Sequence, residues 1–169
     1  MARARATDFL QVTKFKVVET ARAGEQRIVV AGFTSIDIPA LTLEEVTYRE
    51  GTTKFTRKQP GIPTFDNIVL RKGIARIDSK FAKWILDIVD GKEYRIDFTI
   101  LHFHGDEDAS GDTATREYTF FEAFPVNFVP SSGLDASSSD ISIEELQIAF
   151  EKFNVKVNKA NAEGVGAVL

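Results

Sequence analysis

Residues 95–104, RIDFTILHFH, carry a clear alternation of apolar and polar side chains. Ile96, Phe98 and Ile100 occupy every second position, and polar side chains stand between them. This period of two places the apolar side chains on one face, which is typical of a half-buried β-strand. Residues 115–129 form a second aromatic-rich stretch, so we predict a strand there as well, joined to the first by a hairpin tip at 105–114.

Working outward from this hairpin, four more segments are rich in Val, Ile, Phe and Thr. They are residues 9–19, 27–33, 36–49 and 65–73. Each is predicted to be a strand, and Gly24 favours a turn at 21–26 between the first two. Residues 49–63 hold two glycines, two prolines and four cationic side chains, so we predict a long polar loop.

One segment has helical periodicity. Residues 78–90 place apolar side chains at i, i+3, i+4 and i+7, which predicts an amphipathic helix. Asp78 and Ser79 are both suitable N-caps, and Gly91 fits the residue after the helix. The apolar positions are Phe81, Trp84, Ile85 and Ile88.

Residues 140–153 are ambiguous. Ser142 and Glu145 fit a capping box followed by a helical apolar stripe. A strand fits as well, if a one-residue bulge separates Ile143 from Leu146. The preceding residues 129–139, rich in Ser, Gly and Pro, are predicted to be a loop, and residues 154–169 are expected to fray in isolation.

The composition indicates one domain, which we place at 1–153, followed by an extension at 154–169. The chain has 169 residues and is 43% hydrophobic, which is enough for a real core. Fourteen phenylalanines stand against one tryptophan and one methionine, a composition that favours packed sheets over a helical bundle. The predicted fold class is therefore mainly β, with two packed antiparallel sheets and one flanking helix.

Charge and cysteine content exclude several classes of function. The net charge of −4 is wrong in sign for binding a phosphate backbone, so specific nucleic-acid binding is not expected. The absence of cysteine excludes disulfides, thiolate nucleophiles and cysteine-type zinc sites. The first residues lack the apolar stretch of a secretory signal, and no apolar run is long enough to cross a membrane. We expect a protein made and folded in the cytoplasm, without membrane insertion of the monomer.

The predicted hairpin tip offers a candidate calcium site. Its acidic and hydroxyl side chains follow the spacing of an EF-hand loop, with Gly111 at the tight turn. Helices should flank such a loop, whereas strands are predicted here, and an acidic solvated hairpin tip is the alternative. The candidate ligands are Asp106, Asp108, Ser110, Asp112 and Glu117.

Catalytic patterns are weak. His102 and His104 lie on one face of a strand, as in a cupin metal site, but the chain has no third histidine. Glu144 and Glu145, being adjacent in a strand, point apart and make a poor acid/base pair. No phosphate loop or nucleophile elbow is present. We expect no enzyme activity and no cofactor.

An ordered set of segments resembles a known family. The segments are VAGFTSID at 30–37, LEEVTYREG at 43–51, FTRKQPGIPTFDNIVLRKG at 55–73, the helix with Trp84, FEAFPVNF at 121–128 and ISIEELQIAF at 141–150. Together they resemble the tail-tube proteins of contractile phages and of extracellular contractile injection systems. In that family the segment after the Ser-rich loop is a strand, so we predict a strand over 140–153.

The resemblance implies a structural subunit that forms hexameric rings stacked into a hollow tube. It implies a surrounding sheath protein, baseplate and terminator proteins at the ends, and cargo in the lumen. The alternatives are a tube-initiating subunit at the baseplate and a β-barrel metal-binding module. Within the matching region, the loop at 49–63 is the candidate for contact between rings, through cationic and aromatic side chains. The candidate contacts are Arg49, Glu50, Lys54, Phe55, Arg57 and Lys58.

Overall fold

The computed structural model describes residues 10, 12–19, 28–30, 33–51, 54–76, 79–104, 114–137, 139–158 and 166–168. Eleven strands and one helix occur in this part of the chain, which confirms the mainly β fold class. In order they are β1 (Phe15–Glu19), β2 (Ile28–Val30), β3 (Phe33–Asp37), β4 (Leu41–Tyr48), β5 (Arg57–Phe65), β6 (Ile68–Gly73), α1 (Lys80–Val89), β7 (Ile96–His102), β8 (Arg116–Val129), β9 (Ile143–Ala149), β10 (Lys152–Val157) and β11 (Gly166–Val168).

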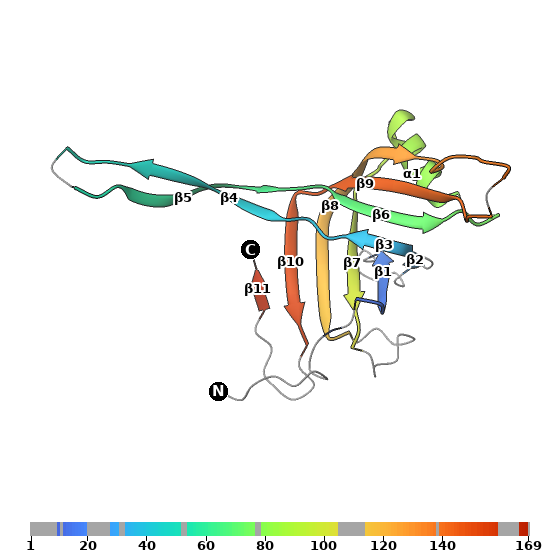
Figure 1. The fold of residues 1–169 in the computed structure, drawn as a ribbon, viewed down its shortest axis with the longest axis horizontal. Helices are drawn as coiled ribbons and strands as arrows, with labels where there is room; N and C mark the ends of the chain where they lie inside the picture. Colours follow the sequence, from blue (N-terminus) through green and yellow to red (C-terminus); the bar gives the residue numbers. More distant parts are fainter. Residues whose placement is uncertain are drawn as a thin grey trace.

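Two antiparallel sheets share strand β8. The first contains β2, β1, β7, the first half of β8, β10 and β11, and the second contains β3, β6, β9 and the second half of β8. In Figure 1 the strands of the first sheet run vertically and those of the second run horizontally above them. Among the described strands, the path from β2 to β3 remains open and does not close into a barrel.

The bend that lets β8 serve both sheets lies at Glu122. This residue has φ of 52°, and the register of β8 with β7 shifts at this point. The backbone N–H of Glu122 donates a hydrogen bond of 2.8 Å to the Asp97 carboxylate, which supports the unusual conformation. Before the bend β8 pairs with β7 and β10. Ala123, just after it, still pairs with Ile96 of β7, and from Phe124 onward β8 pairs with β9.

Phenylalanine rings fill the space between the two sheets. Phe120 lies at the centre, with its ring centroid 5.1 Å from Phe98, 4.9 Å from Phe153 and 5.0 Å from Phe150. Phe120 itself is fully buried, so these rings form the centre of the main hydrophobic cluster. The packed sheets predicted from the phenylalanine content are confirmed.

Helix α1 covers one side of this core and confirms the predicted helix. Phe81 is buried, and the Trp84 indole N–H donates a 2.6 Å hydrogen bond to the carbonyl of Tyr94. The helix ends at Val89, and Gly91, two residues later, has φ of 70°. The N–H groups of Gly91 and Lys92 bond to the carbonyls of Ile88 and Asp87, and this pairing terminates the helix in a left-handed turn.

A buried ion pair lies beneath the helix. Lys72 of β6 and Glu144 of β9 face each other across the two strands, with 3.0 Å between Nζ and Oε1. Their side chains are 2% and 9% exposed, and the ammonium also lies 4.1 Å above the Phe81 ring. Glu145 points to the opposite face, where it binds Arg71, so the two adjacent carboxylates point apart as predicted.

The strand assignment of residues 140–153 is confirmed for β9, and the bulge proposed within it is wrong. The pairing of β6 with β9 is continuous from Ile68 with Ile148 to Gly73 with Ile143. The apolar face of β9 consequently begins with Glu144, and its charge is compensated by Lys72.

Two predicted boundaries also differ. The strand predicted over 140–153 is divided, because β9 ends at Ala149 and a separate strand, β10, begins at Lys152 and pairs with β8 along its whole length. Residues 57–63, predicted to lie in a loop, belong to β5. The two prolines are tolerated there because β5 pairs with β4 on one edge only, so their missing N–H groups do not interrupt a larger sheet.

Candidate assembly surfaces

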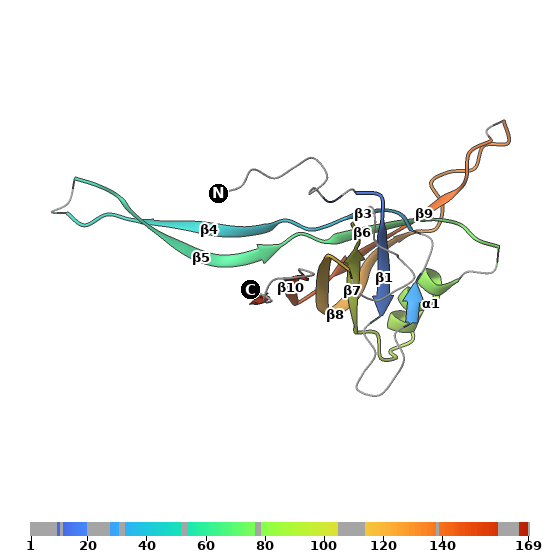
Figure 2. The same ribbon diagram turned by 90° about the horizontal axis from the view of Figure 1, so that it is seen from below.

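Strands β4 and β5 form an arm that leaves the body of the molecule. They pair with each other from Leu41 with Phe65 to Tyr48 with Arg57, and with no other described strand. Figures 1 and 2 show this arm extending far beyond the two sheets in both views. At its base, the Asp66 N–H donates a 3.2 Å hydrogen bond to the Ala40 carbonyl. We call β4, β5 and the connecting residues 49–56 the arm.

A bulge shapes the arm. The register shifts between Leu43 and Glu45, so that Gly61 and Ile62 of β5 stand opposite one residue of β4. A Cβ atom at Gly61 would lie 3.0 Å from the Glu44 carbonyl oxygen and 3.0 Å from a methyl of Val46. Only glycine fits here without moving the backbone of β4, so this position fixes the bend and twist of the arm.

The arm exposes apolar side chains along its length. Phe55 is 81% exposed and Ile62 is 71% exposed, and three more large apolar side chains are about half exposed. Two-stranded ribbons are marginally stable in water, and solvated apolar groups add no stability to them. This surface therefore fits a contact with another molecule. The three others are Leu43, Val46 and Tyr48.

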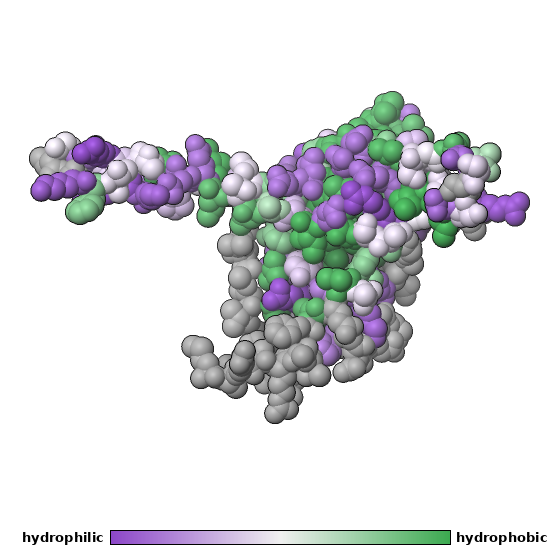
Figure 3. Space-filling view, viewed as in Figure 1, coloured by the Kyte–Doolittle hydropathy of each residue, from purple (hydrophilic) through white to green (hydrophobic). Residues whose placement is uncertain are grey.

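The candidate contact residues all lie at the outer end of the arm. Lys58 bonds Glu45 of the facing strand at 3.0 Å, and the Tyr48 hydroxyl donates to the Glu50 carboxylate, which raises the pKa of Tyr48. Arg49, Lys54, Phe55, Arg57 and Lys58 are exposed, and Glu50 is half-buried. Figure 3 shows hydrophilic side chains clustered toward this end. The structure thus brings the six predicted residues to one end of one element.

A second projection lies at the other end of the longest axis. It is formed by residues 130–142, which connect β8 to β9, and we call it the far loop (Figures 1 and 2). Its two ends are tied together, because the Ser131 and Ser142 hydroxyls lie 2.9 Å apart and the Ser132 N–H bonds the Ile143 carbonyl at 2.8 Å. Leu134 is 91% exposed and Ile141 is 77% exposed.

The outer face of the second sheet carries a row of charges. Arg71 of β6 lies between Asp37 of β3, at 2.7 Å, and Glu145 of β9, at 2.8 Å. Both carboxylates raise the pKa of Arg71 through hydrogen bonds. Beyond this row, β3 pairs with β6 on one side and with no other described strand, so β3 is an open edge of this sheet.

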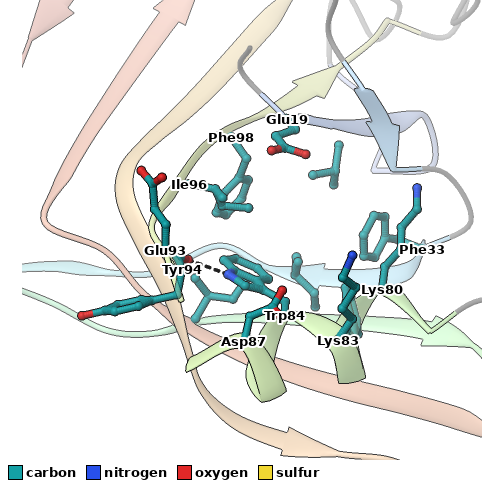
Figure 4. A pocket seen from close by; sticks show the side chains of 14 residues that line it. Glu19, Phe33, Lys80, Lys83, Trp84, Asp87, Glu93, Tyr94, Ile96 and Phe98 are labelled. Atoms are coloured by element: carbon teal, nitrogen blue, oxygen red, sulfur yellow. Dashed lines mark hydrogen bonds between the residues drawn. The ribbon is translucent and has the colours of Figure 1, made fainter. Parts of the chain in front are cut away.

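A pocket of about 340 Å³ lies between helix α1 and the first sheet. Trp84 and Asp87 of the helix face Ile96 and Phe98 of β7, and the dashed line in Figure 4 marks the bond from Trp84 to Tyr94. The lining is mainly apolar and has no histidine.

Only some residues of the predicted metal sites lie within the described part of the chain. Asp106, Asp108, Ser110 and Asp112 lie outside the described residues. Glu117, the fifth candidate ligand, lies in β8, where its carboxylate accepts a hydrogen bond from the Asn158 amide and faces Lys156 at 3.6 Å. His102 lies 6.4 Å from the Tyr118 ring, between centroids. Among the described residues, no three His, Asp or Glu side chains are grouped so as to hold a metal ion.

Sequence reasoning missed two features of these surfaces. It placed Arg57 and Lys58 in a loop, whereas both lie in β5 and pair with the end of the strand predicted over 36–49. It did not identify the far loop as a surface, although Leu134 and Ile141 are isolated apolar residues in a Ser-rich segment.

No helix in the described part of the chain is long and apolar enough to cross a membrane.

Solved structures with the same fold belong to contractile particles. A chain of the extracellular contractile injection system PVC, from its sheath-tube complex in the extended state, is 25% identical with a TM-score of 0.72, covering 88% of this chain and 92% of that one. A chain of the tube-terminating cap of the anti-feeding prophage is 21% identical with a TM-score of 0.72, covering 94% and 95%. A chain of the six-fold symmetrised baseplate of the same prophage is 17% identical with a TM-score of 0.69, covering 84% and 91%. The last two show similarity of fold.

The sequence itself also matches a family. No match to a curated protein was found. Residues 11–154, which include β1 to β9 with the arm, the helix and the far loop, match the family described as T4-like virus tail tube protein gp19. The chain is therefore a member of the T4-like tail tube protein family.

Proposed function

We propose that this chain forms hexameric rings that stack into the hollow inner tube of a contractile injection particle or phage tail. One observation carries the proposal: the arm projects from the body with large apolar side chains exposed, including Phe55 at 81% and Ile62 at 71%. A protein that acts alone gains nothing from such an arm, whereas an assembled subunit can bury it. Six-fold symmetry is supported by the resemblance and by the six-fold baseplate that contains a similar chain.

The arm is the proposed contact between rings. Its outer end combines the exposed aromatic residue Phe55 with Arg49 and Arg57, and aromatic residues and arginine are both enriched at protein interfaces. The edge of β3 is the proposed contact within a ring, because a neighbouring sheet can continue from it by backbone hydrogen bonds. Two different contacts on one subunit are sufficient for a closed ring and an open stack.

The remaining partners follow from where similar chains occur. A sheath around the tube, a baseplate below it and a terminating cap above it are proposed because similar chains occur in a sheath-tube complex, a baseplate and a cap. Cargo would occupy the lumen. We propose that the subunit has no catalytic role, since its family consists of structural tube proteins. A tube-initiating subunit at the baseplate is the alternative within the same family.

Shortening the arm tests the proposal. Residues 49–56 are replaced by Asn-Gly, which closes the hairpin directly between Tyr48 and Arg57, residues that already face each other. The purified native chain should form rods under negative stain and should sediment, and the shortened chain should stay folded but lose at least about tenfold of the sedimenting material.

A matched control removes apolar surface elsewhere. Leu86→Ala with Val89→Ala truncates two exposed residues of α1 and should leave the amount of sedimenting rods within about twofold. Rods of normal length and yield from the shortened chain would refute the role of the arm. A native chain that remains monomeric at high concentration, with its fold intact, would refute the tube.

A further inference from the structure

We infer that the arm of one subunit binds the far loop of a second copy of the same chain in the adjacent ring. This inference rests on the proposed function and adds the receiving surface. The far loop, residues 130–142, and the arm both extend from the body, at opposite ends of the longest axis of the molecule (Figures 1 and 2). Copies placed end to end along that axis therefore bring an arm and a far loop together.

Charge distinguishes the two surfaces. Residues 49–58 at the end of the arm carry four cationic side chains and one acidic side chain. The far loop, residues 130–142, carries two acidic residues, Asp135 and Asp140, and no lysine or arginine. Opposite charges on two surfaces of one chain attract copies in the head-to-tail sense, and like ends repel.

The charged groups stay accessible. Arg57 and Lys54 are exposed at the end of the arm, and Asp135 is exposed in the far loop. The Asp135 carboxylate accepts hydrogen bonds from the Ser137 N–H at 2.9 Å and hydroxyl at 2.7 Å, which lower the pKa of Asp135. These bonds also hold the loop in shape, and a pre-shaped loop loses less conformational entropy on binding.

Exposed apolar side chains provide a second kind of complementarity between the arm and the far loop. Leu134 is 91% exposed and Ile141 is 77% exposed in the far loop, and Phe55 is 81% exposed in the arm. Val126 and Val129, at the end of β8 next to the loop, are also exposed. Apolar side chains surrounded by complementary charges form the usual anatomy of a specific interface, with an apolar centre and a polar rim. The match is heterologous, since the arm and the loop differ, so it can repeat without limit along a tube.

A charge exchange tests this contact. Lys54→Glu with Arg57→Glu reverses the charge at the end of the arm. Asp135→Lys with Asp140→Lys reverses the charge of the far loop. Each pair should lower the amount of sedimenting rods at least about tenfold, and all four changes in one chain should restore it to within about twofold of the native level. Lys80→Glu with Lys83→Glu on helix α1 makes the same change of charge at a different surface and should leave the rods within about twofold.

Cross-linking gives a second measurement that does not depend on charge. The native chain has no cysteine, so Phe55→Cys and Leu134→Cys introduce the only thiols. Rods of the double variant, treated with a short bismaleimide, should give a ladder of linked oligomers under denaturing conditions. Either single variant alone should give monomers, and Phe55→Cys with Val89→Cys should give no ladder.

The two experiments separate this inference from the proposed function. If the arm-shortened chain loses its rods but the charge exchange fails to restore them and positions 55 and 134 do not cross-link, the far loop is not the receiving surface. The tube itself then still stands. If the single variants give linked dimers, like ends meet each other, and the head-to-tail contact is wrong.

Discussion

The buried pair of Lys72 and Glu144 allows a quantitative prediction about stability. Changing Lys72 to Met keeps the length of the side chain and leaves the Glu144 carboxylate, 9% exposed, without the ammonium that lies 3.0 Å away. Breaking one member of a buried pair costs about 3–5 kcal/mol in the free energy of unfolding, because the remaining charge is buried uncompensated. For a chain of this size that corresponds to a fall in Tm of roughly 6–20 °C.

The double variant separates the cost of one unpaired buried charge from the net contribution of the ion pair to stability. Lys72→Met with Glu144→Leu removes both charges and fills the same space, so its free energy of unfolding should be equal to that of the native chain or higher by about 1–4 kcal/mol. Some of this gain is lost, since the ammonium also lies 4.1 Å from the Phe81 ring, a contact worth up to about 2 kcal/mol when desolvated.

Urea denaturation followed by tryptophan fluorescence measures both variants, because Trp84 lies in helix α1 above the pair. The arm-shortened chain is the background, so that assembly does not add to the apparent stability, and sedimentation verifies that each sample is monomeric. A loss below about 0.5 kcal/mol for Lys72→Met alone would contradict the reasoning. So would a double variant less stable than the single one.

Three further predictions use single contacts. Trp84→Phe removes the 2.6 Å hydrogen bond to the Tyr94 carbonyl and should lower the free energy of unfolding by about 0.5–1.5 kcal/mol. Urea denaturation followed by circular dichroism measures this loss. An unchanged midpoint would show that the bond does not stabilise the fold. Gly91→Ala, at φ of 70° in open space, should lower stability by about 1–2 kcal/mol, whereas Gly51→Ala, also in open space, should be neutral or stabilising in the same assay. Gly61→Ala places a Cβ atom 3.0 Å from the Glu44 carbonyl oxygen, so it should reduce the amount of sedimenting rods. The midpoint of thermal unfolding should stay within about 2 °C of the native value. A normal amount of rods would show that assembly does not need the bend of the arm.

The sequence was sufficient to predict those elements whose contacts lie between residues close together in the chain. The helix follows from four apolar positions at helical spacing and from Gly91, and both sets of contacts lie within one or two turns. The alternation in 95–104 likewise identified β7, since each side chain on a strand takes its face from its position alone. The order of segments resembling the tail-tube family carried the fold class and the strand assignment of β9.

Tertiary neighbours decided the rest. Residues 140–153 fit a helix or a strand by pattern, and β9 became a strand because it lies between β6 and β8, which supply its hydrogen bonds. Glu144 in a core face could not be predicted from its own segment, since its partner Lys72 stands 72 residues earlier in the chain. Residues 57–63 look like a loop from their prolines and glycines, and they form a strand because β4 is available beside them and the other edge is open.

The sequence by itself determined a β-rich tube subunit with one helix and a basic, aromatic segment suited to contact. Only the tertiary structure decided that this segment is the end of a long arm and that the far loop lies at the opposite end of the molecule. The physical reason is that a sequence pattern reports which face a side chain occupies along its own segment. Which distant segments become neighbours depends on pairing between strands, and that pairing is set by the whole chain.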